Sequence, residues 1–320
     1  MNNAWLSKNK SKENRSDETE KERIANIVSS VIHEYDVIDD PPCASKMAQN
    51  DQQEKVLTND QSKLSQSSNE RIIMSYPRIN CKEKIVICVD LSSEMDKVTF
   101  RSRAGDKWTP LKLVKRALGF FLHSKSRINK LHEYSLVILH NSAKWVRDFT
   151  SNPKEILSFF EDEILLDTIA CETFDASALF DVLLKRLDLP AVEGDVSVTP
   201  PPYIVRVLMI YGRSHCPIEF RNKESFKQLD SSPYFFVDVM YIHEAPSEEN
   251  KCEMIFDSLC DFDEKGMSYI FEAARNPTKF YDQMSQLLAH PLQRPLQKDI
   301  ACRLHNVAEL VEQSSSSSSS

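Results

Sequence analysis

Apolar residues gather in the middle of the chain, in runs whose spacing alternates between strand and helix. Continuous apolar runs predict buried strands at 84–90, 134–139, 204–211 and 234–242, with a short fifth at 268–271 and an edge strand at 143–149. Helical spacing predicts helices at 109–121, 153–163, 176–187, 248–259 and 277–290. Alternating strands and helices predict an α/β fold: a mainly parallel sheet with helices on both faces.

The two ends of the chain differ from this middle. Residues 1–75 are polar and charged, which predicts a disordered N-terminal arm before a domain at 76–290. One island, Ile24–Tyr35, has apolar residues at helical spacing with charges on either side. It is either a transient helix or a piece docked on the domain, or else a helix that binds a partner. Residues 291–320 are interpreted as a docking segment followed by a polyserine tail.

Charge and cysteine content exclude several classes of function. The net charge is −8 and no Lys/Arg-rich stripe is visible, which argues against direct nucleic-acid binding. No apolar run reaches the 18 or so residues of a membrane span. The eight cysteines include no C-x-x-C pair and are expected to be free thiols in a reducing compartment, the cytoplasm or the nucleus.

The first predicted strand ends in Asp90-Leu91-Ser92-Ser93-Glu94, at the sheet edge where α/β folds place their sites. This sequence resembles the metal-ion-dependent adhesion site of von Willebrand factor A domains, which uses D-x-S-x-S, a threonine from a later loop and a third-loop aspartate. Asp90 and Ser92 match that pattern, and Thr173 matches the threonine. Such oxygen ligands suit Mg²⁺.

Two departures weaken the metal site. Glu94 stands where the second serine is expected, and the loop after Ile210 has Arg213 instead of an aspartate. We therefore predict a degenerate site without metal or other cofactor, in which Asp90, Ser92, Glu94 and Thr173 cap the following helices. The alternative is a metal-dependent ligand-binding module.

Longer segments resemble one family within this fold. They are RINC at 78–81, KIVICVDLSSEM, PPPYIVRVLMIY, SPYFFVDVMYIH and LLAHPLQRP. They are similar to the von Willebrand A-like scaffold subunits called Nba-one, or the mediator of Rap-eighty interactions. Those subunits belong to two deubiquitinase assemblies, BRISC and the breast-cancer-susceptibility-protein A complex. The similarity runs from about Arg78 to Pro295.

The resemblance implies a non-catalytic scaffold. It implies binding to the ubiquitin-E2-variant subunit (the brain and reproductive organ-expressed protein). Through that subunit it implies contact with an Abraxas-type scaffold and with a zinc metalloprotease that cleaves Lys63-linked ubiquitin. It also implies a role in the DNA damage response, with no direct nucleic-acid or membrane partner.

An enzyme would need a nucleophile with a base, or a metal. The chain has no G-x-S-x-G, no G-x-x-x-x-G-K-[ST] and no H-E-x-x-H. Cys171 with His132 or His140 is the best cysteine-hydrolase pair, and a buried thiol is the simpler interpretation. No catalytic residue is predicted.

The segment His290-Pro291-Leu292-Gln293-Arg294-Pro295 follows the last predicted helix. Its prolines are explained either as a helix stop or as an extended docking motif. With the resemblance, we predict that Pro291, Leu292, Arg294 and Pro295 bind a partner. In that prediction Arg294 is a solvated side chain that offers a forked donor.

Overall fold

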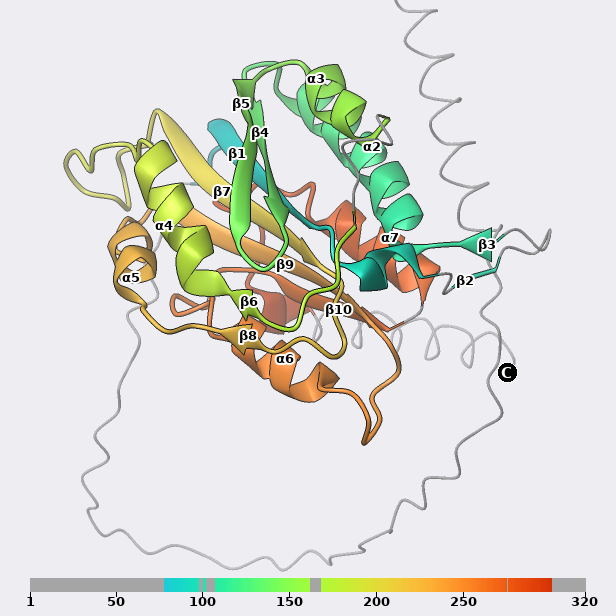
Figure 1. The fold of residues 1–320 in the computed structure, drawn as a ribbon. Helices are drawn as coiled ribbons and strands as arrows, with labels where there is room; N and C mark the ends of the chain where they lie inside the picture. Colours follow the sequence, from blue (N-terminus) through green and yellow to red (C-terminus); the bar gives the residue numbers. More distant parts are fainter. Residues whose placement is uncertain (1–77, 98–99, 102–106, 162–167, 275, 301–320) are drawn as a thin grey trace, which may run out of the picture.

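The computed structural model describes residues 78–97, 100–101, 107–161, 168–274 and 276–300. A six-stranded sheet forms its centre, in the order β10-β9-β7-β1-β4-β5 (Figure 1). The strands are β1 (Lys82–Asp90), β4 (Glu133–Leu139), β5 (Ala143–Thr150), β7 (Tyr203–Tyr211), β9 (Phe235–His243) and β10 (Ile270–Ala274). All neighbours pair in parallel except β5, which runs antiparallel to β4 at one edge.

Helices cover both faces of the sheet (Figure 1). One face packs against α2 (Pro110–Ile128), α3 (Pro153–Leu157) and α7 (Pro277–Gln286). The other packs against α4 (Ala176–Arg186), α5 (Glu224–Asp230) and α6 (Cys252–Cys260). Short elements complete the described chain: η1 (Ser93–Asp96), η2 (Ser158–Phe160), the pair β2 (Phe100–Arg101) and β3 (Lys107–Trp108), and the pair β6 (Phe174–Asp175) and β8 (Ile218–Glu219). The predicted fold class is confirmed.

The differences from the predicted elements have local causes. Helix α2 continues seven residues past position 121 because its last turns bury Leu122 and Lys125 against the sheet. Helix α5 was not predicted, since it is short and buries only Phe226 and Leu229. Strand β10 begins at Ile270, two residues later than expected.

The chain ends are only partly covered by the structure. The predicted N-terminal arm, with the island Ile24–Tyr35, and the polyserine tail lie outside the described residues. Residues 291–300 are described and contact the sheet, so the packed chain continues beyond the predicted boundary at 290. Within the described ranges, no helix combines the length and the apolar character needed to cross a membrane.

Candidate functional site

Asp90, the last residue of β1, is buried at the carboxyl edge of the sheet. Four hydrogen-bond donors from the protein itself surround its carboxylate. The backbone N–H and the hydroxyl of Ser92 donate to it at 3.0 Å each, and the Gly212 N–H donates at 3.1 Å. The fourth donor is the Arg213 guanidinium, whose Nε lies 3.0 Å from Asp90 Oδ1. Both carboxylate oxygens are therefore satisfied within the chain.

Arg213 is itself completely buried, and its guanidinium connects three loops. Its Nη2 donates to the carbonyls of Leu139 (3.2 Å) and His140 (2.5 Å), and its Nη1 donates to the Thr173 carbonyl (3.4 Å). Burial disfavours the charge, but the Asp90 carboxylate outweighs it, so the pKa of Arg213 is raised. The Arg213 guanidinium is permanently charged, and its hydrogen bonds join the ends of strands β1, β4 and β7.

The other residues of the predicted site also bond to this loop. The Ser214 N–H donates to Glu94 Oε2 at 2.8 Å, so the carboxylate that replaces serine holds the Arg213 loop in place. Thr173 contributes its backbone carbonyl. Asp90, Ser92, Glu94 and Thr173 thus lie around one loop, but the predicted helix caps do not form, since the Ser92 side chain does not cap η1 and Asp175 caps α4. Their common partner, however, is the loop carrying Arg213.

These residues do not fit a divalent cation. A cation would have to displace the guanidinium from Asp90, and the third-loop carboxylate that would help to hold it is an arginine. Across the described parts of the chain, no group of three or more His, Cys, Asp or Glu side chains is placed to bind a metal ion. The arrangement is a buried ion pair that fixes three loops, so its role is structural.

Gly212 lies tightly against Met95, and this gives a stability prediction. A Cβ at Gly212 would lie 1.9 Å from Met95 Sδ, whereas a Cβ at Gly119 in α2 would meet nothing within 4 Å. We expect Gly212→Ala to lower the free energy of unfolding by about 1–3 kcal/mol through overpacking. The same change at Gly119 should raise it by about 0.5–1 kcal/mol through helix propensity. Urea denaturation of both variants measures whether the two changes in the free energy of unfolding have opposite signs.

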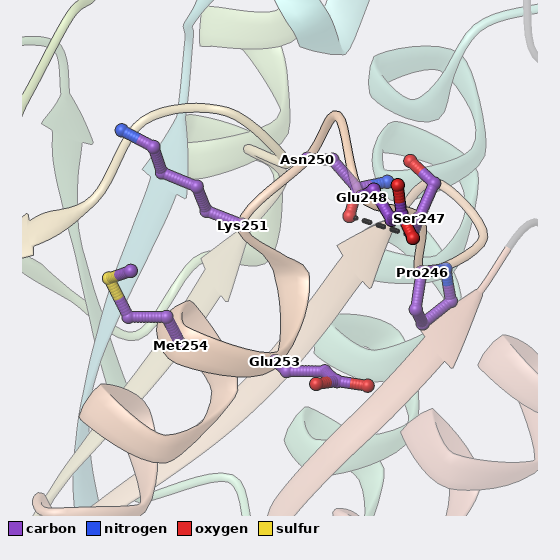
Figure 2. A pocket seen from close by; sticks show the side chains of 7 residues that line it. All are labelled: Pro246, Ser247, Glu248, Asn250, Lys251, Glu253 and Met254. Carbon is purple, nitrogen blue, oxygen red and sulfur yellow. Dashed lines mark hydrogen bonds between the residues drawn. The ribbon is translucent and has the colours of Figure 1, made fainter.

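A shallow hollow of about 490 Å³ lies in the loop that leads from β9 into α6. Figure 2 shows its lining: Pro246, Ser247, Glu248, Asn250, Lys251, Glu253 and Met254. The Ser247 N–H donates to Asn250 Oδ1 at 3.2 Å, which closes the turn on itself. Neither Asp90 nor Arg213 lines this hollow, so it gives no access to the ion pair.

The second predicted site, the segment after α7, is packed against the domain. Arg294 forms a fork onto Asp238 of β9, with Nη1 2.8 Å from Oδ2 and Nη2 2.5 Å from Oδ1. Its guanidinium also lies 3.8 Å from the Tyr269 ring centroid, and the Tyr269 hydroxyl donates to the Pro295 carbonyl at 2.7 Å. The Arg294 side chain is 1% exposed. The expectation that Arg294 is solvated is therefore wrong, because its partner is inside this chain.

The neighbouring residues behave in the same way. Pro291 is buried, and Leu292 packs in a small apolar cluster with Ile204, Tyr234 and Phe236. Gln293 is exposed and Pro295 is half-buried. Among the four residues predicted to bind a partner, Pro295 is thus the one whose side chain reaches the surface. Whether the segment binds a partner stays a prediction.

Sequence reasoning missed a buried charge network at the amino ends of the strands. Glu83 of β1 is fully buried and contacts Lys125 of α2, and it lies 3.3 Å from Arg206 Nη1 of β7. Arg206 Nε in turn lies 2.6 Å from Asp238 Oδ2, which joins this network to Arg294. Burial alone would raise the pKa of Glu83, but Lys125 and Arg206 outweigh it and lower that pKa. The sequence did carry a signal for this network, because Glu83, Arg206 and Asp238 are charged residues inside otherwise apolar strands.

Two buried histidines beside Glu83 make stability depend on pH. Burial lowers the pKa values of His132 and His290 to about 4, from 6.5. As pH falls from about 6.5 to 4, the unfolded chain binds protons that the folded protein excludes, so the free energy of unfolding falls. Because each of the two pKa values is lowered by about 2.5 units, we expect a loss of about 3 kcal/mol per histidine, or about 6 kcal/mol together, in this window, measured by urea denaturation at constant ionic strength. His290→Gln removes one of the two groups, so it should reduce this pH dependence by about half.

The cysteine-hydrolase pairing does not assemble. His132 precedes β4, where its Nδ1 accepts the Glu83 N–H at the amino edge of the sheet, and His140 follows β4 with an Nε2 that makes no hydrogen bond. Cys171 lies beside the carboxyl edge, next to Ile169, which bridges to Ser92. Burial raises the pKa of the Cys171 thiol, which is opposite to what a nucleophile requires. The six cysteines that the structure describes are unpaired.

Fold and site together define a class of protein. The sheet is parallel with one antiparallel edge strand, and an aspartate ends β1 in the position of an adhesion-site ligand. This is a von Willebrand A-like domain in which an arginine pairs with that aspartate. No protein-family profile matches the chain. Its similarity to individual curated proteins is nevertheless extensive.

The curated relatives show the family. The chain is 38% identical to BRISC and BRCA1-A complex member 1 of Danio rerio over 226 residues, covering 69% of this chain and 60% of that protein. It is 38% identical to the Xenopus laevis protein over 234 residues (72% and 70%) and 37% identical to the Homo sapiens protein over 242 residues (74% and 70%). The chain belongs to the BRISC and BRCA1-A complex member 1 family.

Solved structures with similar folds are more distant. The PilB minor pilin from Streptococcus sanguinis aligns with a TM-score of 0.48 at 12% identity, over 68% of this chain and 63% of that one. The SpRpn10 VWA domain aligns with a TM-score of 0.45 at 14% identity, over 68% of this chain and 99% of that one.

Proposed function

We propose that the protein is a non-catalytic scaffold subunit of a deubiquitinase assembly specific for Lys63-linked ubiquitin, of the BRISC type or the nuclear BRCA1-A type. The proposal is supported by the relatives, which are named as members of those two complexes. In this proposal its direct partner is the ubiquitin-E2-variant subunit. Through that subunit it reaches the Abraxas-type scaffold and the zinc metalloprotease. It acts in the cytoplasm and the nucleus, without a cofactor.

The observation that carries the non-catalytic part of the proposal is the Asp90–Arg213 pair. In an α/β domain the carboxyl edge of the sheet is where a ligand would bind. Here the guanidinium of Arg213 fills that position and donates hydrogen bonds to the Asp90 carboxylate and to three backbone carbonyls. A domain whose ligand position is closed by its own side chain is suited to binding partners through its outer surface.

The packed C-terminal segment is the proposed partner surface. Arg294 and Leu292 anchor the segment on the domain through their buried contacts with Asp238 and with the small apolar cluster. Gln293 and Pro295 lie toward solvent. Because the segment is already ordered, little conformational entropy would be lost when a partner covers it. Arg294 is thus a positioning residue for the docking segment, and its contact with the partner is indirect.

Co-expression with the ubiquitin-E2-variant subunit tests the proposal. The full chain should co-purify with that subunit as a complex of defined mass in native mass spectrometry. Adding the Abraxas-type scaffold and the metalloprotease should give an assembly that cleaves Lys63-linked chains. The chain alone should cleave none. A chain that stays monomeric beside the folded E2-variant subunit would contradict the proposal.

A further inference from the structure

The loop that joins α4 to β7 is long and is fixed by its own hydrogen bonds. It spans residues 188–202 and contains neither helix nor strand. The Tyr203 hydroxyl donates to the Asp188 carbonyl at 3.0 Å, which ties the two ends of the loop together. In its middle the Asp195 carboxylate accepts from the N–H and the hydroxyl of Ser197, at 2.9 and 2.7 Å. Long loops that a compact domain keeps in order commonly carry function.

Two apolar side chains of this loop are held in solvent. Val198 is 72% exposed and Val192 is 50% exposed, whereas nearly all large apolar side chains of the described chain are buried or half-buried. Pro190 and Pro201, on either side of the two valines, are buried and restrict the backbone. Two apolar side chains on one fixed loop lose little conformational entropy when a partner covers them. Their exposure therefore favours a contact outside the chain.

The loop shares its base with the docking segment. Val196 packs against the small apolar cluster that contains Leu292 and, at the start of β7, Ile204. The exposed Val198 lies two positions beyond Val196, and the exposed Gln293 directly follows Leu292. Figure 1 shows the loop projecting from the domain between α4 and β7. Loop and segment thus belong to one region of the surface, at the amino ends of the strands.

The docking segment by itself offers too little surface for a stable complex. In a standard interface each partner buries about 800 Å², spread over about 20–30 residues. Within the segment, Gln293 is exposed and Pro295 is half-buried, whereas the side chains of Leu292 and Arg294 are buried in the domain. A partner that binds the segment must therefore cover neighbouring surface as well, and the loop is a neighbour with apolar side chains to cover.

The charge of the loop narrows the chemistry of its partner. Between Arg186 and Arg206 the chain has no lysine or arginine, whereas Asp188, Glu193 and Asp195 are all exposed. The Asp195 carboxylate is already bonded within the loop. Glu193, which directly follows the first exposed valine, is then the carboxylate nearest to the apolar contact in the chain. A complementary surface carries apolar side chains bordered by lysine or arginine.

We propose that the loop 188–202 is the second half of the surface that docks the ubiquitin-E2-variant subunit. In this arrangement apolar side chains of that subunit cover Val192 and Val198, and a basic side chain faces Glu193. The inference rests on the proposed function, from which it takes the partner and the docking segment. The two contacts act together, because the segment alone buries too little area.

Binding of the full chain to the purified E2-variant subunit tests the apolar contact. Val198→Asp should weaken the affinity by about tenfold or more, because a charge would be desolvated against apolar side chains. Met254, 56% exposed on α6 at the opposite edge of the sheet, provides the control. Met254→Asp should keep the affinity within about twofold of the wild type. Both variants should keep the wild-type melting temperature, since exposed side chains contribute little to folding.

A charge series at Glu193 tests the polar contact. Glu193→Lys should weaken binding by about tenfold and Glu193→Gln by about twofold, and the difference should shrink in about 0.5 M NaCl as charges are screened. Asp257, exposed on α6, is the matched control. Asp257→Lys makes the same charge reversal away from the loop and should change the affinity by less than about twofold.

The outcomes separate this inference from the proposed function. If the wild-type chain does not bind the E2-variant subunit, both are wrong. If the wild type binds, and Val198→Asp and Glu193→Lys bind equally well, the loop lies outside the interface and only this inference is wrong. If native mass spectrometry of the chain alone finds a dimer that Val198→Asp separates, the occupant of the loop is a second copy, which also overturns the inference.

Discussion

Replacing Arg213 with alanine should lower the free energy of unfolding by about 3–5 kcal/mol, the cost of leaving a buried carboxylate without its partner. Asp90 would keep the donors from Ser92 and Gly212 but lose its neutralising charge. The carbonyls of Leu139, His140 and Thr173 would also lose their shared donor. Urea denaturation of the full chain measures the loss.

A control at a nearby arginine distinguishes burial from charge. Arg221 pairs with Glu219, but its side chain is 74% exposed, so Arg221→Ala should change the free energy of unfolding by less than about 0.5 kcal/mol.

A metal titration tests the ion pair itself. Because Arg213 already pairs with Asp90, the wild-type protein should have the same melting temperature in millimolar Mg²⁺ as in the presence of a chelator. A large rise with Mg²⁺, abolished by Asp90→Ala, would contradict the assignment of this site as an ion pair.

Arg294→Ala should lower the free energy of unfolding by about 2–4 kcal/mol, because it removes a bidentate partner from the buried Asp238. Asp238 would keep Arg206 and the Tyr269 N–H, which limits the loss. Under the proposed function, the variant also weakens binding to the proposed partner, the E2-variant subunit, since the segment at Gln293 and Pro295 would lose its anchor.

The matched control lies next to it in the chain. Gln293 is exposed, so Gln293→Ala should keep the stability of the wild type and change only partner affinity. Arg294→Lys should recover part of the stability, because lysine keeps the charge and loses the fork. If Arg294→Ala melts like the wild type, Arg294 is not anchored on Asp238 in solution.

The order of strands and helices was determined by the sequence, because each element must bury an apolar face with its own period. The run from Lys84 to Asp90 predicted a buried parallel strand, and the structure has β1 at Lys82–Asp90. The missing third-loop aspartate was also visible in the sequence. So were the segments that identify the family. These features depend on residues that are neighbours in the chain.

Only the tertiary structure decided where the buried charges pair. Arg213 meets Asp90 across 123 positions, and Arg294 meets Asp238 across 56. Such pairs depend on strand register, which places Glu83 of β1 beside Ile204 of β7 and so brings Arg206 onto the same face of the sheet. A charge in a sequence has no fixed partner, because solvent or any opposite charge can satisfy it. Burial inside the fold removes the solvent and leaves one geometry in which the charge is paired.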